Sequence, residues 1–125
     1  MFKGSRVGAS DNSGVISAKI IQTYRRKLNP VGVKCLAVLR IFDPFKKQLQ
    51  KKKKYGALVV AAKQSIRRKN GSCIRFNSNK SLFFADKDFD KFISTRVFGP
   101  VGREIILAGL NSLIRQKIDV GCSVL

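Results

Sequence analysis

The sequence contains no histidine, and only 7 of its 125 residues are acidic. Without histidine, the Ser-His-Asp and Cys-His nucleophile systems cannot form, and the commonest metal ligand is missing. The phosphate-binding loops GxxxxGK(S/T) and GxGxxG are also absent from the sequence. A strongly positive field lowers the pKa of the remaining carboxyl groups, which is the wrong direction for a general acid. We therefore expect a protein that is not an enzyme, with no catalytic residues and no cofactor.

Cysteine is scarce, and its positions do not indicate a metal centre. Cys35, Cys73 and Cys122 are far apart and form no CxxC pair. Each lies in an apolar stretch, so we expect buried free thiols, with metal ligation as the weaker alternative. Asp86, Asp88 and Asp90 are interspersed with Lys87 and followed by Lys91, but the spacing lacks the glycine and the terminal glutamate of a calcium loop. We interpret this segment as a solvated turn and expect no metal site.

Positive charge is the feature that the sequence has in excess. Its 26 lysines and arginines give a formal net charge of +19 at pH 7. Because a net charge of about 2–8 already keeps a small domain soluble, we infer an anionic partner. Nucleic acid is favoured over a membrane, since the sequence has no long amphipathic basic helix, no lipidation motif and no apolar run of transmembrane length.

Short apolar segments separated by turn residues predict β-strands along most of the chain. The strands are expected at residues 5–10, 15–23, 33–42, 57–62, 73–76, 82–84 and 93–98. From Gly102 the period changes, with one helical turn near Glu104 and a short amphipathic helix around residues 110–117. We therefore expect a mainly β fold, a small five-stranded β-barrel with short C-terminal α-helices. Residues 1–125 form one domain in this interpretation, with the barrel in 1–100 and a helical appendix in 101–125.

The alternation of apolar and polar residues predicts which side chains share a face. Ile16, Ala18 and Ile20 are expected on one face of their strand, and Ile41 on the same face as the other odd-numbered apolar residues of 33–42. Ser94 is expected on the polar side of its strand.

The cations gather in the expected turns, where they repel one another unless a polyanion is present. The turn at residues 67–69 has three adjacent cations and no acid nearby, and residues 51–54 are four consecutive lysines. Segment 45–54 is interpreted either as a loose tether or as a clamp that orders on a polyanion, and we favour the clamp. The residues that we assign to RNA contact are Arg25, Arg26, Lys27, Lys46, Lys47, Lys51, Lys52, Lys53, Lys54, Lys63, Arg67, Arg68, Lys69, Arg75 and Arg103.

The aromatic residues indicate how RNA is recognised. Proteins that bind single strands stack exposed aromatic side chains on bases. Here the phenylalanines mostly lie in apolar runs, so we expect folded RNA to be recognised by shape and backbone. The alternative is a free-standing module of the OB type for single-stranded nucleic acid, which requires Tyr24, Tyr55 or Phe45 to be exposed.

Three motifs resemble a known family. The sequence has DNSG at residues 11–14, RRKNGSCIRF at 67–76 and STRVFGPVGREI at 94–105. These motifs resemble, in order and approximate spacing, the ADNSG, RRPDGSxIRF and GTRIFGPVxREL motifs of the universal large-subunit ribosomal protein L-fourteen family. The resemblance covers nearly the whole chain.

The resemblance implies a five-stranded barrel that binds large-subunit ribosomal RNA at the face toward the small subunit. It also implies a bridge to small-subunit ribosomal RNA and contact with neighbouring large-subunit ribosomal proteins. On related proteins a ribosome-silencing factor docks at positions that match Thr95, Arg96 and Lys117, so these would be protein-contact residues.

The chain also departs from the family pattern. Segment 45–54 is denser in lysine, Ala57 and Val33 stand where the family often has an acid, and the ending IDVGCSVL is only loosely similar. The richness in lysine, asparagine and phenylalanine, without a recognisable presequence, resembles organelle-encoded members. We favour a mitochondrial ribosome, with a bacterial or plastid ribosome as the alternative.

Overall fold

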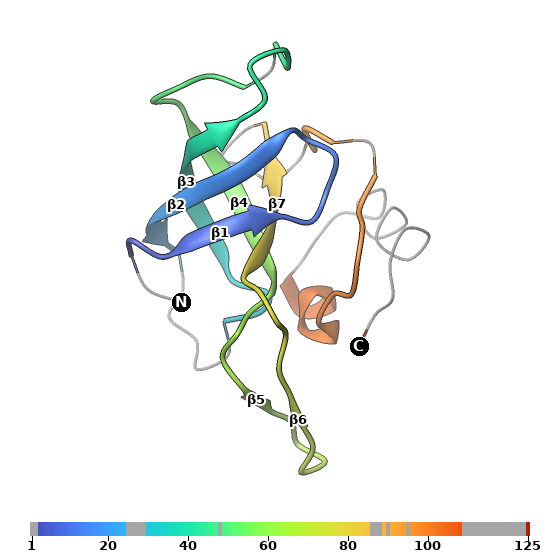
Figure 1. The fold of residues 1–125 in the computed structure, drawn as a ribbon. Helices are drawn as coiled ribbons and strands as arrows, with labels where there is room; N and C mark the ends of the chain where they lie inside the picture. Colours follow the sequence, from blue (N-terminus) through green and yellow to red (C-terminus); the bar gives the residue numbers. More distant parts are fainter. Residues whose placement is uncertain are drawn as a thin grey trace.

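The structure is a computed structural model that describes residues 3–24, 30–47, 49–85, 89, 91–94, 96–108 and 125. Its elements are β1 (Arg6–Ala9), β2 (Val15–Thr23), β3 (Lys34–Phe42), β4 (Lys54–Ala61), β5 (Ile66–Arg67), β6 (Cys73–Ile74), β7 (Lys80–Phe84) and the 3-10 helix η1 (Arg103–Ala108). Five strands close a barrel in the order β1-β2-β3-β4-β7, and β5 pairs with β6 in a separate hairpin (Figure 1). The expected mainly β fold with a five-stranded barrel is confirmed.

Strands β4 and β7 are buried on both faces, which explains their continuous apolar sequence. Val59 and Phe83 point into the barrel and belong to its interior cluster. Leu58 and Phe84 point the other way, into a second cluster that includes Ile105 of η1. Burying a side chain of this size stabilises the fold by about 1.5–3 kcal/mol. The barrel wall formed by β4 and β7 is therefore the centre of the core.

Two β-bulges overturn part of the predicted alternation. The register of β2 and β3 shifts between Val15 and Ser17 and again between Ser17 and Ala18, so each strand carries an extra residue near Ile41. A bulge turns side chains away from the face that strict alternation would give them. The prediction that Ile16 shares a face with Ala18 is therefore wrong, because Ile16 is 63% exposed. Ile41 is likewise 56% exposed and does not lie in the core.

Residues 93–98 do not form the predicted strand. The described residues of this segment and its neighbours join the barrel through the isolated bridges Phe84↔Phe92 and Asp11↔Val97 and through single hydrogen bonds, such as those from the Ile93 N–H to the Phe83 carbonyl at 3.4 Å and from the Phe98 N–H to the Ser10 carbonyl at 2.7 Å. Ser94 is buried rather than on a polar side. The segment follows the barrel wall without the repeated pairing that makes a strand.

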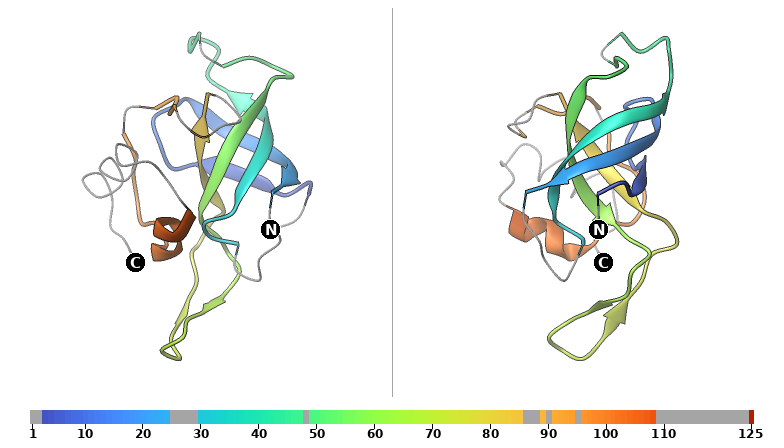
Figure 2. Two further views of the ribbon diagram at one scale, coloured as in Figure 1. Left: turned by 180° about the vertical axis from the view of Figure 1, so that it is seen from behind. Right: turned by 90° about the vertical axis from the view of Figure 1, so that its left-hand side faces the viewer.

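The cysteines differ in burial. Cys35 is buried as expected, and desolvation raises the pKa of its thiol to about 12. Cys73 is exposed, so the prediction of a buried thiol there is wrong. It lies in the short β5–β6 hairpin, which protrudes from the barrel and is not covered by a second layer among the described residues (Figure 2). Cys122 lies outside the described residues.

The described C-terminal segment packs against the turn that precedes β3. Gly32 adopts φ +84°, and a Cβ there would lie 2.9 Å from the Glu104 carbonyl oxygen. The Gly102 N–H donates to the Val60 carbonyl at 2.9 Å. The turn expected near Glu104 is present as the 3-10 helix η1, whereas the helix expected around 110–117 lies outside the described residues. No helix in the described part of the chain is long and apolar enough to span a membrane.

Candidate nucleic-acid interface

The β5–β6 hairpin projects a cationic tip from one end of the barrel (Figure 1). The tip is a hydrogen-bonded turn, in which the Ser72 N–H and hydroxyl both donate to Asn70 Oδ1, at 3.0 and 2.6 Å. Gly71 adopts φ +86°, as the Asn-Gly turn signal predicted. Ile66 is buried at the hairpin base, and the cations Arg67, Lys69 and Arg75 are exposed. The hairpin therefore presents three exposed cations on a short protruding strand pair.

Arg68 differs from its neighbours because it has an acidic partner. Its Nε lies 3.1 Å from Glu104 Oε1, and its Nη2 lies 3.5 Å from Glu104 Oε2. The expectation that no acid lies near this turn is wrong, since Glu104 is 36 positions away in sequence and is brought here by η1. The pair fixes the hairpin against the body of the protein and neutralises one of the assigned RNA-contact residues.

The described residues of segment 43–54 form a second surface, rich in exposed lysines, at the opposite end of the barrel (Figure 1). The Phe45 N–H donates to Asp43 Oδ1 at 3.0 Å, and the Gln50 N–H donates to the Tyr55 hydroxyl oxygen at 2.9 Å. Leu49 is only 6% exposed and anchors the middle of the segment in the barrel interior. These contacts hold the backbone of Phe45 and Gln50 and the side chain of Leu49 in place, and the interpretation of the segment as a clamp for a polyanion stays a prediction.

The lysines of this second surface are exposed, although the Lys53 Nζ lies 5.3 Å from the Tyr55 ring centroid and Lys46 extends toward the DNSG turn. Lys46, Lys47 and residues 51–54 are exposed, although Lys54 already lies in β4 rather than in the loop. Among the described cations that the sequence assigned to RNA, Lys46, Lys47 and residues 51–54 thus lie at one end of the barrel, and the hairpin cations lie at the other. Lys63 and Arg103 are also exposed, and Arg25, Arg26 and Lys27 lie outside the described residues.

The acids among the described residues are occupied within the fold. Asp43 caps the loop, Glu104 pairs with Arg68, and Asp11 accepts hydrogen bonds from the Ser13 hydroxyl at 2.6 Å and from the Phe83 N–H at 3.4 Å. Burial raises the pKa of Asp11, while the hydrogen bonds from Ser13 and Phe83 act in the opposite direction. Because these carboxylates have structural partners, they leave most of the exposed cations without a counter-charge.

Two contacts join the three sequence motifs in space. The Arg96 N–H donates to Asn12 Oδ1 at 3.2 Å, which links residues 94–105 to the DNSG turn. The pair between Arg68 and Glu104 links the same segment to the hairpin motif. Sequence reasoning identified the motifs but gave no signal for these contacts. Of the predicted protein-contact residues, Arg96 is exposed, while Thr95 and Lys117 lie outside the described residues.

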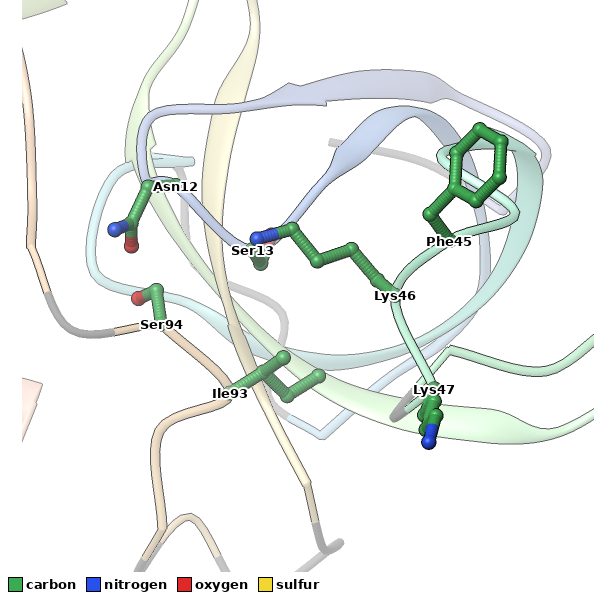
Figure 3. Close-up of a pocket in the computed structure, with 7 residues that line it drawn as sticks. All are labelled: Asn12, Ser13, Phe45, Lys46, Lys47, Ile93 and Ser94. Atoms are coloured by element: carbon green, nitrogen blue, oxygen red, sulfur yellow. The ribbon is translucent and has the colours of Figure 1, made fainter.

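A pocket of about 330 Å³ opens beside the second surface (Figure 3). The DNSG turn contributes Asn12 and Ser13, the loop contributes Phe45, Lys46 and Lys47, and Ile93 and Ser94 line it from the segment that follows Phe92. Figure 3 shows Lys46 extending toward Ser13, while Lys47 points away from it. The sequence did not predict this pocket, because its walls come from three segments distant in the chain.

The three aromatic residues considered for base stacking differ in access. Tyr55 is 1% exposed and cannot stack on a ligand. Tyr24 is 45% exposed, and the edge-to-face contact with Phe89 at 5.9 Å between ring centroids occupies part of its surface. Phe45 is 90% exposed. Of the three, Phe45 alone presents nearly all of its ring to solvent.

A comparison with known families matches most of the chain to one family. The model of the family described as ribosomal protein L14p/L23e matches residues 1–116. The match includes both cationic surfaces, the DNSG turn and η1.

Proposed function

We propose that the two cationic surfaces of this protein contact RNA at opposite ends of the barrel. The chain belongs to the L14p/L23e family of ribosomal proteins. It is thus a structural large-subunit protein that binds ribosomal RNA. The residues proposed for contact at one end are Arg67, Lys69 and Arg75. Those at the other end are Lys46, Lys47 and residues 51–54. Arg68 contributes through its position in the hairpin rather than as a free cation.

The observation that carries this proposal is the separation of charge within the fold. Asp11, Asp43 and Glu104 have partners inside the protein, while the loop and hairpin cations are exposed at both ends of a rigid body. A polyanion long enough to reach both ends gains contacts that a small anion cannot make. Ribosomal RNA is such a polyanion.

The salt dependence of RNA binding tests the proposal. The purified chain is titrated with large-subunit ribosomal RNA at 50 and 200 mM salt. Neutralising even six phosphates predicts a loss of affinity of about a thousandfold over this range. An affinity that scarcely changes would contradict phosphate contact by these cations.

We further propose that the protein lies at the intersubunit face, where it touches small-subunit ribosomal RNA and a neighbouring large-subunit protein. The exposed Arg96, with its backbone held by Asn12, supports a protein-contact surface that includes Thr95 and Lys117 and could receive a ribosome-silencing factor. Arg96→Glu should weaken binding of such a factor, and Arg40→Glu, an exposed charge outside the motif, serves as the control. Equal binding by both variants would rule out this surface.

The protein is a component of a ribosome, and we propose the mitochondrial ribosome as its location, with the bacterial and plastid ribosomes as alternatives. Sedimentation of the tagged protein from fractionated cells separates these possibilities. Co-migration with large subunits of the mitochondrial fraction supports the proposal. Recovery in slowly sedimenting fractions free of large subunits would instead favour the free-standing OB-type module, for which the exposure of Phe45 is the supporting observation.

A further inference from the structure

Phe45 is held in an exposed position by the loop around it. Its side chain is 90% exposed, yet its backbone N–H donates to Asp43 Oδ1 at 3.0 Å. The next N–H, that of Lys46, donates to the Asp43 carbonyl at 3.3 Å. The preceding residue, Pro44, fixes its own φ. The ring is thus presented to solvent by a constrained turn rather than by a free tail.

The pocket beside this ring combines an apolar side with cations. Ile93 gives it an apolar wall, and Lys46 and Lys47 stand on the loop side (Figure 3). The stem of Lys46 passes over Gly14, where a Cβ would lie 2.8 Å from the Lys46 Cγ. Gly14 therefore gives Lys46 room to extend along the DNSG turn. The glycine also adopts φ +91°, which other residues rarely accept.

The size of the pocket limits what it can hold. Sites for small ligands have volumes of about 300–1,000 Å³, so 330 Å³ corresponds to one small group and not to a helical segment. An exposed aromatic ring stacks on any nucleobase, and adjacent lysines attract phosphates. A chain of net charge +19 disfavours a cationic ligand.

We propose that this pocket, with Phe45 at its edge, binds one unpaired ribonucleotide of the RNA strand. The base stacks on the exposed ring of Phe45 at the edge of the pocket, and Lys46 and Lys47 contact the phosphates that flank it. This inference rests on the proposed function, because ribosomal RNA is the source of the nucleotide. It adds a single-strand contact to a protein that otherwise recognises the backbone of folded RNA.

Binding of the purified full-length chain to three probes tests the proposal. The probes are a ten-nucleotide uridine oligonucleotide, a ten-base-pair RNA duplex and free uridine monophosphate. Phe45→Leu should weaken binding of the oligonucleotide about 5- to 150-fold, the effect of losing one stacked base, and leave the duplex unchanged. Phe45→Trp should retain the wild-type affinity. Phe98→Leu, at a half-exposed phenylalanine outside the pocket, is the matched control and should have no effect.

The flanking phosphates distinguish a strand from a free nucleotide. Uridine monophosphate should compete only weakly with the oligonucleotide, and competition at equal concentration would overturn the assignment to an RNA strand. Equal oligonucleotide binding by wild type and Phe45→Leu would overturn the stacking site itself. If wild type and Phe45→Leu bind the oligonucleotide equally but both still bind large-subunit RNA in a salt-dependent way, the proposed function stands and only the stacking site is excluded. If neither protein binds large-subunit RNA in this way, both the proposed function and the stacking site are excluded.

Discussion

Arg68 and Glu104 face each other with two nitrogen-oxygen pairs at 3.1 and 3.5 Å, and they join a hairpin turn to the first turn of η1. Their side chains are 25% and 18% exposed, so water screens this pair less than a fully exposed one. A paired geometry of this kind gives the hairpin a defined direction from the barrel. It is the structural reason why Arg67 and Lys69 can meet a fixed target.

Removal of this pair should therefore loosen the hairpin. Glu104→Gln is expected to lower the free energy of unfolding by about 1–2 kcal/mol, between the values for exposed pairs and for hydrogen bonds to charged groups. Urea denaturation of Glu104→Gln, Arg68→Gln and the double variant measures the coupling. Strictly additive effects of the two single changes would show that the residues do not stabilise each other.

Gly32 and Gly71 form a matched pair for a second prediction. Both adopt positive φ, at +84° and +86°, but a Cβ at Gly32 would meet the Glu104 carbonyl, whereas one at Gly71 would meet nothing within 4 Å. Gly71→Ala should lower the free energy of unfolding by about 1–2 kcal/mol, the cost of a left-handed backbone conformation in a residue with a Cβ. Gly32→Ala should lower the free energy of unfolding by about 1–3 kcal/mol more than Gly71→Ala, because the added Cβ forces η1 to move away. Equal losses in thermal unfolding would show that η1 does not pack on this turn.

The hydroxyl of Tyr55 supports the loop that carries the lysines. Tyr55→Phe removes the acceptor of the Gln50 N–H and should lower stability by about 0.5–1.5 kcal/mol. The change should also speed proteolytic cleavage within segment 45–54, since the free N–H no longer fixes the turn. Cleavage within 67–69 is the internal control and should keep its rate. Faster cleavage in both loops would indicate general destabilisation rather than loss of this contact.

Asp11 should give the fold a defined dependence on pH. Burial raises its folded-state pKa above the ordinary value of 3.8, so between these two values the folded protein binds more protons than the unfolded chain. The contribution of Asp11 to stability is therefore complete below pH 3.8 and is lost as the pH rises through the raised pKa. The difference in unfolding free energy between wild type and Asp11→Asn should fall over this window and then remain constant. If this difference instead rises with pH, the hydrogen bonds to Asp11 lower its pKa by more than burial raises it.

The strands were predictable because their signals are local. Residues 15–23 match β2 in both bounds, and the Asn70-Gly71 turn lies where the sequence placed it. The exposure of Ile16 was not predictable in the same way, since a bulge depends on the register with β3 and not on the alternation within β2. Similarly, Cys73 is apolar in sequence context but lies on a hairpin that nothing covers among the described residues.

The candidate site was predictable in composition but not in arrangement. The runs at 51–54 and 67–69 identify the cations, yet no local signal places them at opposite ends of the barrel. The pairing of Arg68 with Glu104 and the presence of Phe45 and Ile93 around one pocket both depend on how distant segments are brought together. The positions of the exposed cations on the surface therefore depend on contacts between distant segments, which composition alone does not predict.

The most direct test of the central claim is the reactivity of the loop lysines inside the native particle. Acetylation rates of Lys46, Lys47 and Lys51 are measured by mass spectrometry in isolated large subunits, in subunits digested with nuclease and in the purified chain. If RNA covers this end of the barrel, these lysines react slowly in intact subunits and recover the rate of the purified chain after digestion. Rates in intact subunits that equal those of the purified chain would contradict the account, because the lysines would then face solvent with no RNA beside them.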